Sequence, residues 1–370
     1  MAPPLVNAWA ISLIKRMNKF RINRKKEHLI LASQGFRCSF TALYEDILLP
    51  HDCLTTISPE ETDLSTEYCG IPVQSPLYIN AITGGALVSE NVNRKLAVLA
   101  KEFNLPIAVG SQQAGIHNPQ LKFTYQVVRK YNPEGVVMAN LPATATVMQA
   151  KAAVEMVEAQ ILQLYLNPAQ EFIMPEGERA NKKLLANVAD ICAQVSVPVL
   201  VKEIGFGIGA SQAASLAKAG VRAVDVSGTG GTNFARIEGR RNSSRWWLPL
   251  AAWGLPTPLC VADVAVNGPK IDVLASGGVD DGISALKCLC LGAAAVGNAG
   301  GILWHLRNRG LAGAKNYVAN YLRQMRTGLA LMGQSTLAGL HQIPLVITGR
   351  FKELLKQRGI SAKYYWRRGY

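Results

Sequence analysis

Three short motifs in the second half of the chain combine glycine with a small polar or amide residue. They are GTGGT at 228–232, SGG at 276–278 and NAGG at 298–301. Glycine lets backbone N–H groups come close to an anion, and a helix that starts directly afterwards adds the positive end of its dipole. These motifs therefore favour phosphate binding over the alternative, in which the glycines serve only to form turns.

Polar side chains occur at comparable points in the first half of the chain. Thr83 lies in a TGG motif, Ser111 is followed by Gln112 and Gln113, and Asn140 follows an apolar run. Such hydroxyl and amide groups can hydrogen-bond the edge of a planar ring, although each could also cap a loop. They predict one polar surface if the fold brings them together.

Two charged residues each have two interpretations. Lys202 ends an apolar run, where it either pairs with an acid such as Glu203 or places its ammonium against the electron-rich edge of a flavin. Adjacent strand residues point to opposite faces, which disfavours the pair. Glu171 is either a solvated loop acid or a Mg²⁺ ligand, since Mg²⁺ takes one or two carboxylates beside substrate phosphate oxygens. Residue type alone does not decide between these two roles of Glu171.

The elements that must position these residues are strands that alternate with helices. Eight β-rich runs are predicted at 76–82, 106–109, 135–139, 160–166, 197–201, 222–226, 271–275 and 293–296. Helical patterns occupy 90–103, 144–159, 182–195, 211–219 and 283–291. Runs such as VPVLV lack polar alternation, as parallel strands covered on both faces do. The pattern predicts an α/β fold, a closed (β/α)8 TIM barrel.

In a barrel of this kind the carboxyl ends of the strands meet at one rim, where ligands bind. Every motif described above directly follows a predicted strand. SGG follows the seventh strand and NAGG follows the eighth, and these are the two positions where barrels commonly bind phosphate. The sequence therefore predicts one ligand site at this rim.

Length and composition fit one large domain, because 370 residues that are 49% hydrophobic can build a large aliphatic core. We expect a basic N-terminal extension over 1–23, for which disorder is one expectation. A single barrel domain with a loop-rich lead-in is expected over 24–349, and a basic C-terminal tail over 350–370. The longest insertion, 232–259, contains several arginines and tryptophans and predicts a lid or a binding loop.

The net charge of +14 is concentrated at the two ends of the chain. Because no recognition motif accompanies it, we expect solvated arms and no nucleic-acid binding. The apolar stretch 5–14 is too short to span a bilayer, and positive residues follow it instead of preceding it, unlike a secretory signal. Seven cysteines at irregular spacing predict reduced thiols. A cytoplasmic protein without a membrane span is expected.

The order of the motifs resembles the type 2 isopentenyl-diphosphate isomerases, an FMN-dependent family. The matching segments are RKKEHL at 24–29, AITGG at 81–85, GSQ at 110–112, LNPAQE at 166–171, MPEG at 174–177, VKEIGFGI at 201–208, GTGGT at 228–232, IEGRR at 237–241, WGLPT at 253–257 and ASGG at 275–278. The resemblance implies an FMN-type TIM barrel that converts isopentenyl diphosphate to dimethylallyl diphosphate. It also implies reduced FMN, Mg²⁺, NADPH to keep the flavin reduced, and a homo-oligomer, either a tetramer or an octamer.

The same resemblance implies roles for individual residues. The substrate would contact Arg24, Lys25, His28, Ser111, Gln112, Gln113, Tyr165, Asn167 and Gln170, of which Gln170 is the candidate catalytic residue near the allylic carbons. FMN would contact Ile82, Thr83, Gly84, Ser111, Asn140, Lys202, Ser227, Thr232, Gly277, Gly278, Ala299 and Gly300. Glu171 would hold Mg²⁺. Because an amide is a poor proton carrier, the reduced flavin is the implied acid–base group.

Three positions depart from the family pattern. Tyr165 replaces a histidine expected near the diphosphate by a phenol that stays neutral at pH 7. Pro142 follows Leu141 where the family has a glycine, which makes that loop stiffer. Asp280 stands where a basic residue is common, and it would oppose the FMN phosphate. These departures bear on substrate affinity and substrate identity.

Two alternatives remain open. Another FMN-dependent barrel, such as a 2-hydroxy-acid oxidase, would use a histidine base and a carboxylate-binding arginine at the late strands, and neither 228–232 nor 276–280 supplies them. A nucleic-acid or membrane-surface binder that uses the barrel as a scaffold would bind through the basic ends and would be colourless when purified.

Overall fold

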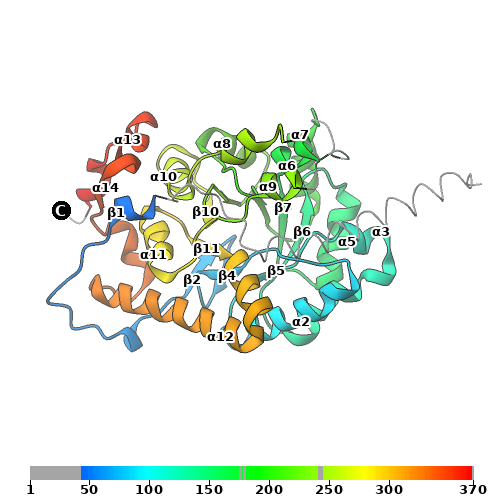
Figure 1. Cartoon of the computed structure of the whole chain (residues 1–370), viewed down its shortest axis with the longest axis horizontal. Helices are drawn as coiled ribbons and strands as arrows, with labels where there is room; N and C mark the ends of the chain where they lie inside the picture. The colour runs from blue at the N-terminus through cyan, green and yellow to red at the C-terminus, as the bar shows by residue number, and fades with distance from the viewer. Residues whose placement is uncertain (1–42, 175–176, 178–180, 241–244, 369–370) are drawn as a thin grey trace, which may run out of the picture.

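The computed structural model describes residues 43–174, 177, 181–240 and 245–368. Its centre is a closed barrel of parallel strands in the order β10-β11-β4-β5-β6-β7-β8-β9 (Figure 1). The strands are β4 (Leu77–Ile79), β5 (Ile107–Ala108), β6 (Val137–Pro142), β7 (Ile161–Tyr165), β8 (Val199–Lys202), β9 (Ala223–Asp225), β10 (Asp272–Ser276) and β11 (Ala295–Asn298). Each coincides with one predicted run, so the predicted TIM barrel is confirmed.

Helices surround the barrel on its outer side (Figure 1). They are α2 (Leu87–Glu102), α3 (Gln113–His117), α4 (Phe123–Tyr131), α5 (Val147–Val157), α6 (Pro168–Ile173), α7 (Leu184–Gln194), α8 (Ala210–Lys218), α9 (Phe234–Gly239), α10 (Thr257–Asn267), α11 (Gly282–Leu291) and α12 (Gly300–Leu331). The five predicted helical stretches coincide with α2, α5, α7, α8 and α11. Helix α5 begins at a capping box between Thr146 and Gln149, as its sequence favours.

The barrel interior contains two layers of side chains, one from each strand in each layer. The lower layer is apolar apart from one phenol: Tyr78, Ala108, Met138, Ile161, Leu200, Ala223, Leu274 and Ala295, each at most 4% exposed. The upper layer lies two residues further along every strand, where the side chain returns to the same face: Asn80, Gly110, Asn140, Gln163, Lys202, Asp225, Ser276 and Gly297. The interior therefore changes from apolar to mostly polar within one strand step.

The lead-in closes the barrel below the lower layer. Strands β2 (Thr66–Tyr68) and β3 (Ile71–Val73) form an antiparallel hairpin. Tyr68, Cys69 and Val73 of this hairpin pack in the same cluster as the lower layer. One end of the interior is thus covered by apolar residues, and ligands must reach the barrel from the other end.

The C-terminal segment is folded against the barrel, so the expectation of a solvated arm is wrong for its described part. Helix α13 (Gly349–Gln357) and helix α14 (Lys363–Trp366) bury Phe351, Leu355 and Tyr365. Strand β12 (Val346–Ile347) pairs with β1 (Ile47–Leu48), beside which α13 lies (Figure 1). The positive charges sit on the outer faces of an amphipathic segment. The whole of the predicted N-terminal extension, 1–23, lies outside the described residues, as do residues 24–42.

The insertion at 232–259 is partly helical and is not one long loop. It contains α9, the 3₁₀ helix η4 (Leu248–Ala252) and the start of α10. An apolar cluster of Ile173, Ala235, Trp247 and Ala251 holds α6 against α9 and η4. The insertion therefore brings its own side chains to the rim above β7. Within the described ranges, no helix is both long enough and apolar enough to cross a membrane.

Candidate active site

A cavity of about 490 Å³ opens at the carboxyl ends of the barrel strands. Its walls come from the ends of β4, β8, β9, β10 and β11 and from the start of α12. Eight of the predicted cofactor residues line it: Ile82, Lys202, Ser227, Thr232, Gly277, Gly278, Ala299 and Gly300. The structure therefore brings the three glycine motifs and Lys202 together around one space, as the barrel rim predicts.

The glycine motifs pack so tightly against one another that side chains would not fit. Gly277 and Gly278 have φ angles of 93° and 82°, which L side chains rarely adopt. A Cβ on Gly231 would lie 2.7 Å from the Gly278 nitrogen. Beside them α12 begins at Gly300 and directs its positive end toward the cavity. Exposed backbone N–H groups and a helix start are the features of a phosphate site.

Lys202 lies at the floor of the cavity and is 7% exposed. Its Nζ donates a hydrogen bond of 2.9 Å to the Glu203 carbonyl oxygen. Burial lowers the pKa of Lys202, and the nearby carboxylates of Asp225 and Glu203 oppose this shift. A buried ammonium at a ligand cavity is suited to a negatively charged or electron-rich ligand.

The Glu203 carboxylate stabilises the loop after β8 instead of pairing with Lys202. Its Oε2 accepts hydrogen bonds of 2.7 Å from the backbone N–H groups of both Ile204 and Gly205, and two further N–H groups of the same loop point to it. Burial raises the pKa of Glu203, while these N–H donors act in the opposite direction. Glu203 thus fixes the backbone that follows Lys202.

Two buried amide oxygens of the upper layer are suited to a ligand with N–H or O–H donors. Asn140 and Gln163 are register partners on β6 and β7. The Asn140 Oδ1 and the Gln163 Oε1 have no hydrogen-bond partner among the residues that the structure describes. Orphaned buried acceptors are costly, so a ligand that donates to them stabilises the site. The isoalloxazine ring and the ribityl chain of FMN offer such donors, and these residues fit the cofactor.

Four predicted flavin residues do not line this cavity: Thr83, Gly84, Ser111 and Asn140. The Thr83 hydroxyl lies 2.9 Å from that of Ser89. Gly84 has no room for a Cβ because the Tyr125 ring packs against it. Thr83 and Gly84 follow β4, Ser111 follows β5 and Asn140 lies within β6, and the contact of these residues with FMN stays a prediction.

The candidate catalytic residue Gln170 lies on α6, just after β7, and its amide is held from both sides. Its Oε1 accepts a hydrogen bond of 3.1 Å from the Asn167 Nδ2, and its Nε2 donates one of 2.6 Å to Glu238 Oε1. The Asn167 Nδ2 also donates to Glu171 Oε1 at 2.7 Å. Asn167, Gln170 and Glu171 therefore form one hydrogen-bonded group.

Glu238 is a site residue that sequence reasoning missed. It lies on α9, is fully buried and contacts Gln170 across the interface between α6 and α9. A buried carboxylate is unusual and functional sites are enriched in them. The available signal was its place in the IEGRR segment at 237–241, shortly after GTGGT at 228–232. Its partner is distant in the sequence, so the contact itself was hidden.

The other predicted substrate residues differ in their surroundings. The Tyr165 hydroxyl donates to Ser111 Oγ at 3.3 Å, so the phenol that replaces the expected histidine faces the end of β5. The Gln112 amide is used by the protein itself, because it donates to Ala153 O and accepts from Asn140 N, both at 2.9 Å. Gln113 begins α3. Finally, Arg24, Lys25 and His28 lie outside the described residues.

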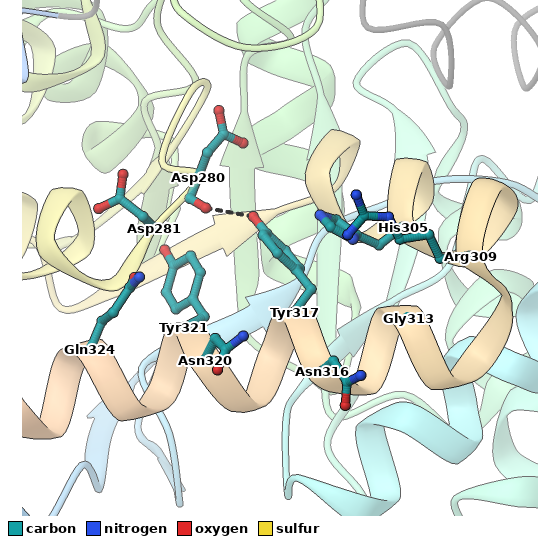
Figure 2. A pocket seen from close by; sticks show the side chains of 10 residues that line it. All are labelled: Asp280, Asp281, His305, Arg309, Gly313, Asn316, Tyr317, Asn320, Tyr321 and Gln324. Carbon is teal, nitrogen blue, oxygen red and sulfur yellow. Dashed lines mark hydrogen bonds between the residues drawn. The ribbon is translucent and has the colours of Figure 1, made fainter.

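A second cavity, of about 340 Å³, lies beside the first between α12 and the loop after β10 (Figure 2). Asp280 and His305 contribute to both cavities. The Tyr317 hydroxyl donates to the Asp280 carbonyl oxygen at 2.6 Å, and the His305 ring stacks on Tyr317 with 4.4 Å between centroids. The sequence placed only His28 near a ligand, whereas the structure adds His305. Asp280 is adjacent to the glycine motifs, as its position after SGG implies.

In the part of the chain that the structure describes, no three histidine, cysteine or carboxylate side chains are grouped so as to hold a metal ion. A magnesium ion that uses a single carboxylate and the oxygens of a diphosphate would not need such a group. The assignment of Glu171 as a Mg²⁺ ligand therefore stays a prediction.

Comparison with known proteins defines the class. A sequence profile of the family described as FMN-dependent dehydrogenase matches residues 138–346. Together with the closed barrel and its phosphate-type rim, this match defines an FMN-dependent barrel enzyme.

Individual relatives define the family more closely. The isopentenyl-diphosphate delta-isomerase of Symbiobacterium thermophilum is 43% identical over 350 residues, which cover 92% of this chain and 96% of that protein. The isopentenyl-diphosphate delta-isomerase of Bacillus pumilus is 41% identical over 346 residues, 93% of this chain and 97% of that protein. The chain belongs to the isopentenyl-diphosphate delta-isomerase family, and the resemblance seen in its motifs is confirmed.

Solved structures with the same architecture have very different sequences. A mandelate oxidase mutant matches with a TM-score of 0.60 at 12% identity and covers 90% of this chain and 98% of its own. A flavocytochrome b2 mutant matches with a TM-score of 0.62 at 14% identity, over 93% of this chain and 88% of its own. At these identities the likeness concerns the fold alone, so it does not favour an oxidase.

Proposed function

We propose that this chain converts isopentenyl diphosphate to dimethylallyl diphosphate with reduced FMN and Mg²⁺, and that NADPH keeps the flavin reduced. The observation that carries the proposal is the meeting at one rim of a phosphate-type glycine cradle, the buried Lys202 and the connected pair Gln170 and Glu238. Family membership points to the same reaction.

FMN would place its phosphate at Gly277, Gly278 and Gly300 and its ring system over Lys202. When bound, reduced FMN supplies an electron-rich face and an acid–base group beside the allylic carbons. Lys202 would balance the negative charge of the cofactor with its ammonium. The unpaired oxygen of Asn140 would accept a hydrogen bond from the ring.

Moving a double bond along an allylic unit requires that one carbon gains a proton and another loses one. Gln170 is suited to orientation in this step and not to proton transfer, because an amide neither gains nor loses a proton near neutral pH. Its hydrogen bonds to Asn167 and Glu238 fix which end of the amide faces the substrate. A fixed polar group of this kind holds a small apolar chain in one position.

The diphosphate would be bound by Arg24, Lys25 and His28, and its Mg²⁺ by Glu171. Asn167 supports that assignment, because it holds the Glu171 carboxylate beside the Gln170 amide. In this arrangement the metal and the allylic end of the substrate would lie on the same side of α6.

We further propose that the protein is a cytoplasmic homo-oligomer, either a tetramer or an octamer. Light scattering after size-exclusion chromatography measures the oligomeric state directly.

The test of the function uses purified protein with FMN, a reductant, Mg²⁺ and isopentenyl diphosphate. Dimethylallyl diphosphate should form only when flavin is bound and reduced, and chelation of Mg²⁺ should stop the reaction. Absence of product with the flavin bound and reduced would reject the proposal. Reduction of the flavin by a 2-hydroxy acid would identify an oxidase instead.

A further inference from the structure

Asp225 is a buried carboxylate at the centre of the upper layer, and the proposed reaction does not use it. It is fully buried at the end of β9. The Tyr78 hydroxyl donates to its Oδ2 at 2.6 Å and the Asn80 Nδ2 donates at 2.9 Å. The Ser276 hydroxyl lies 2.8 Å from both carboxylate oxygens, and the Ser227 N–H donates to Oδ1 at 3.2 Å. Asp225 thus gathers donors from three different parts of the barrel.

All of these partners donate, which is the arrangement that a carboxylate accepts. Burial raises the pKa of Tyr78 well above its usual value, and the negative charge of Asp225 adds to this shift. The phenol therefore keeps its proton and remains a donor. The result is a fixed negative charge inside the barrel, stabilised by hydrogen bonds from neutral groups.

Three of these donors, Asn80, Ser227 and Ser276, also line the cofactor cavity. The single hydroxyl hydrogen of Ser276 is directed to Asp225, so toward the cavity this hydroxyl can offer only lone pairs. The Asn80 amide is fixed as well, because its Oδ1 accepts from Ala81 N at 2.8 Å. Asp225 therefore determines which atoms the floor of the cavity presents to a ligand.

Lys202 is the nearest cation of this layer. Lys202 and Asp225 are register partners on β8 and β9, strands that lie about 4.8 Å apart, and both side chains enter the interior. Burial lowers the pKa of Lys202, and Asp225 is the largest influence in the opposite direction, followed by Glu203. The Glu203 carboxylate is already bound by backbone N–H groups of its own loop. Asp225 is the counter-charge that remains for Lys202.

We propose that Asp225 is a positioning residue for the cofactor, which fixes the polar floor beneath the flavin and holds Lys202 in its protonated form. The inference rests on the proposed function, because it requires that FMN occupies the cavity above Lys202. Its consequence is electrochemical: an ammonium beside the flavin favours the reduced, more negative form of the ring. Asp225 would set the reduction potential without touching the cofactor.

The test compares the midpoint potential of bound FMN in the wild type and in Asp225→Asn. Loss of the carboxylate should weaken the preference for reduced over oxidised FMN about tenfold, which lowers the potential by about 30 mV for a two-electron couple. The decrease should grow as the pH rises, because Lys202 then loses its proton at a lower pH than in the wild type. The matched control is Asp272→Asn. Asp272 lies at the start of β10, at the opposite end of this strand from Ser276, and its carboxylate accepts a hydrogen bond from Cys69 N.

A double-mutant cycle separates this role from a structural one. In a Lys202→Met background, Asp225→Asn should no longer lower the potential, because the ammonium through which it acts is gone. Equal potentials for Asp225→Asn and Asp272→Asn, or an equal decrease with and without Lys202, would overturn the inference. A wild-type protein that binds no flavin at all would instead refute the proposed function.

If Asp225→Asn does not fold, Ser276→Ala provides the same test. It removes the hydroxyl that donates to both carboxylate oxygens, so that the carboxylate is held less firmly as the counter-charge of Lys202. The potential should decrease by a smaller amount, and the decrease should vanish in the Lys202→Met background. An unchanged potential in Ser276→Ala, or a decrease that persists without Lys202, contradicts the proposal.

Discussion

The lower and upper layers of the barrel interior occupy the same strands and the same face, two residues apart, yet they have opposite character. The lower layer, with Leu200 and Leu274 among its members, is closed by the β2–β3 hairpin and packs as a core. The upper layer holds a buried ammonium, a buried carboxylate and several amides beneath an open cavity. Tyr78 joins them, because its ring belongs to the lower layer and its hydroxyl binds Asp225.

This contrast indicates which layer stabilises the fold and which layer faces the candidate site. Burying apolar side chains stabilises the fold, whereas burying Lys202 costs free energy unless a ligand or a counter-charge compensates. The two layers should therefore respond differently to substitution. Variants of the lower layer should reduce stability, and variants of the upper layer should reduce cofactor binding and turnover.

The largest effect is expected for Lys202→Met, whose apolar side chain is of similar length. Loss of the ammonium should decrease kcat/KM for isopentenyl diphosphate by about 10²–10³-fold, the range for a preorganised charge at a reaction centre. The urea midpoint of unfolding without cofactor should decrease only slightly, because the Asp225 carboxylate that loses its counter-charge keeps its hydrogen-bond donors Tyr78, Asn80 and Ser276. Lys218→Met at the end of α8 is the control. A large loss of stability with little loss of activity would contradict the division between layers.

Leu200→Ala tests the lower layer with the opposite readout. The side chain is fully buried in the interior cluster, so its truncation should decrease the free energy of unfolding by about 2–5 kcal/mol. Turnover per bound flavin should stay within about twofold of the wild type at a temperature where the variant is folded. Leu48→Ala, on a half-exposed strand residue, should change stability far less. A selective loss of turnover in Leu200→Ala would show that the layers are coupled.

Asn140→Ala tests the orphaned oxygen of the upper layer. If that oxygen accepts a hydrogen bond from FMN, the variant should bind FMN about tenfold more weakly, in line with about 1–1.5 kcal/mol for one hydrogen bond. Fluorescence titration of the apoprotein measures this affinity, and the exposed Asn91→Ala is the control. Unchanged affinity would place Asn140 outside the flavin contact.

The smallest effect concerns thiol reactivity near the lower layer. Burial raises the pKa of Cys69 to about 12, so its thiolate is scarce near neutral pH, whereas Cys53 is exposed. Iodoacetamide at pH 8 should label Cys53 in the folded protein and leave Cys69 unlabelled until denaturant is added. Peptide mass spectrometry reports both sites. Rapid labelling of Cys69 would indicate that the hairpin opens readily.

Much of the fold was predictable because continuous apolar runs are a strong signal for buried parallel strands. The glycine motifs after β9, β10 and β11 were equally informative, since any ring of parallel strands brings its carboxyl ends together. The helical parts of the insertion and the packed C-terminal segment were missed. In the C-terminal segment, Phe351, Leu355 and Tyr365 are the buried positions, but the many positive residues around them suggested a solvated arm.

The parts of the site that escaped prediction are pairs of residues distant in the sequence. Glu238 has meaning only beside Gln170, and Asp225 only beside Tyr78 and Ser276. No local pattern encodes such contacts, because they depend on which strands and helices become neighbours. Gln112 shows the converse, since its place in a motif suggested a ligand contact and its amide instead bonds to Ala153 O and Asn140 N.

The closure of the barrel has a consequence for the order of events during synthesis. Leu77 of β4 pairs with Val296 of β11, and Ile47 pairs with Ile347, so these contacts span most of the chain. Contacts of such high sequence separation form slowly and late in folding. Asp225 draws donors from Tyr78 and from Ser276, which meet only as the ring closes. In a nascent chain the upper layer of the barrel is therefore incomplete, and FMN binding must follow translation of β11, the last strand of the barrel.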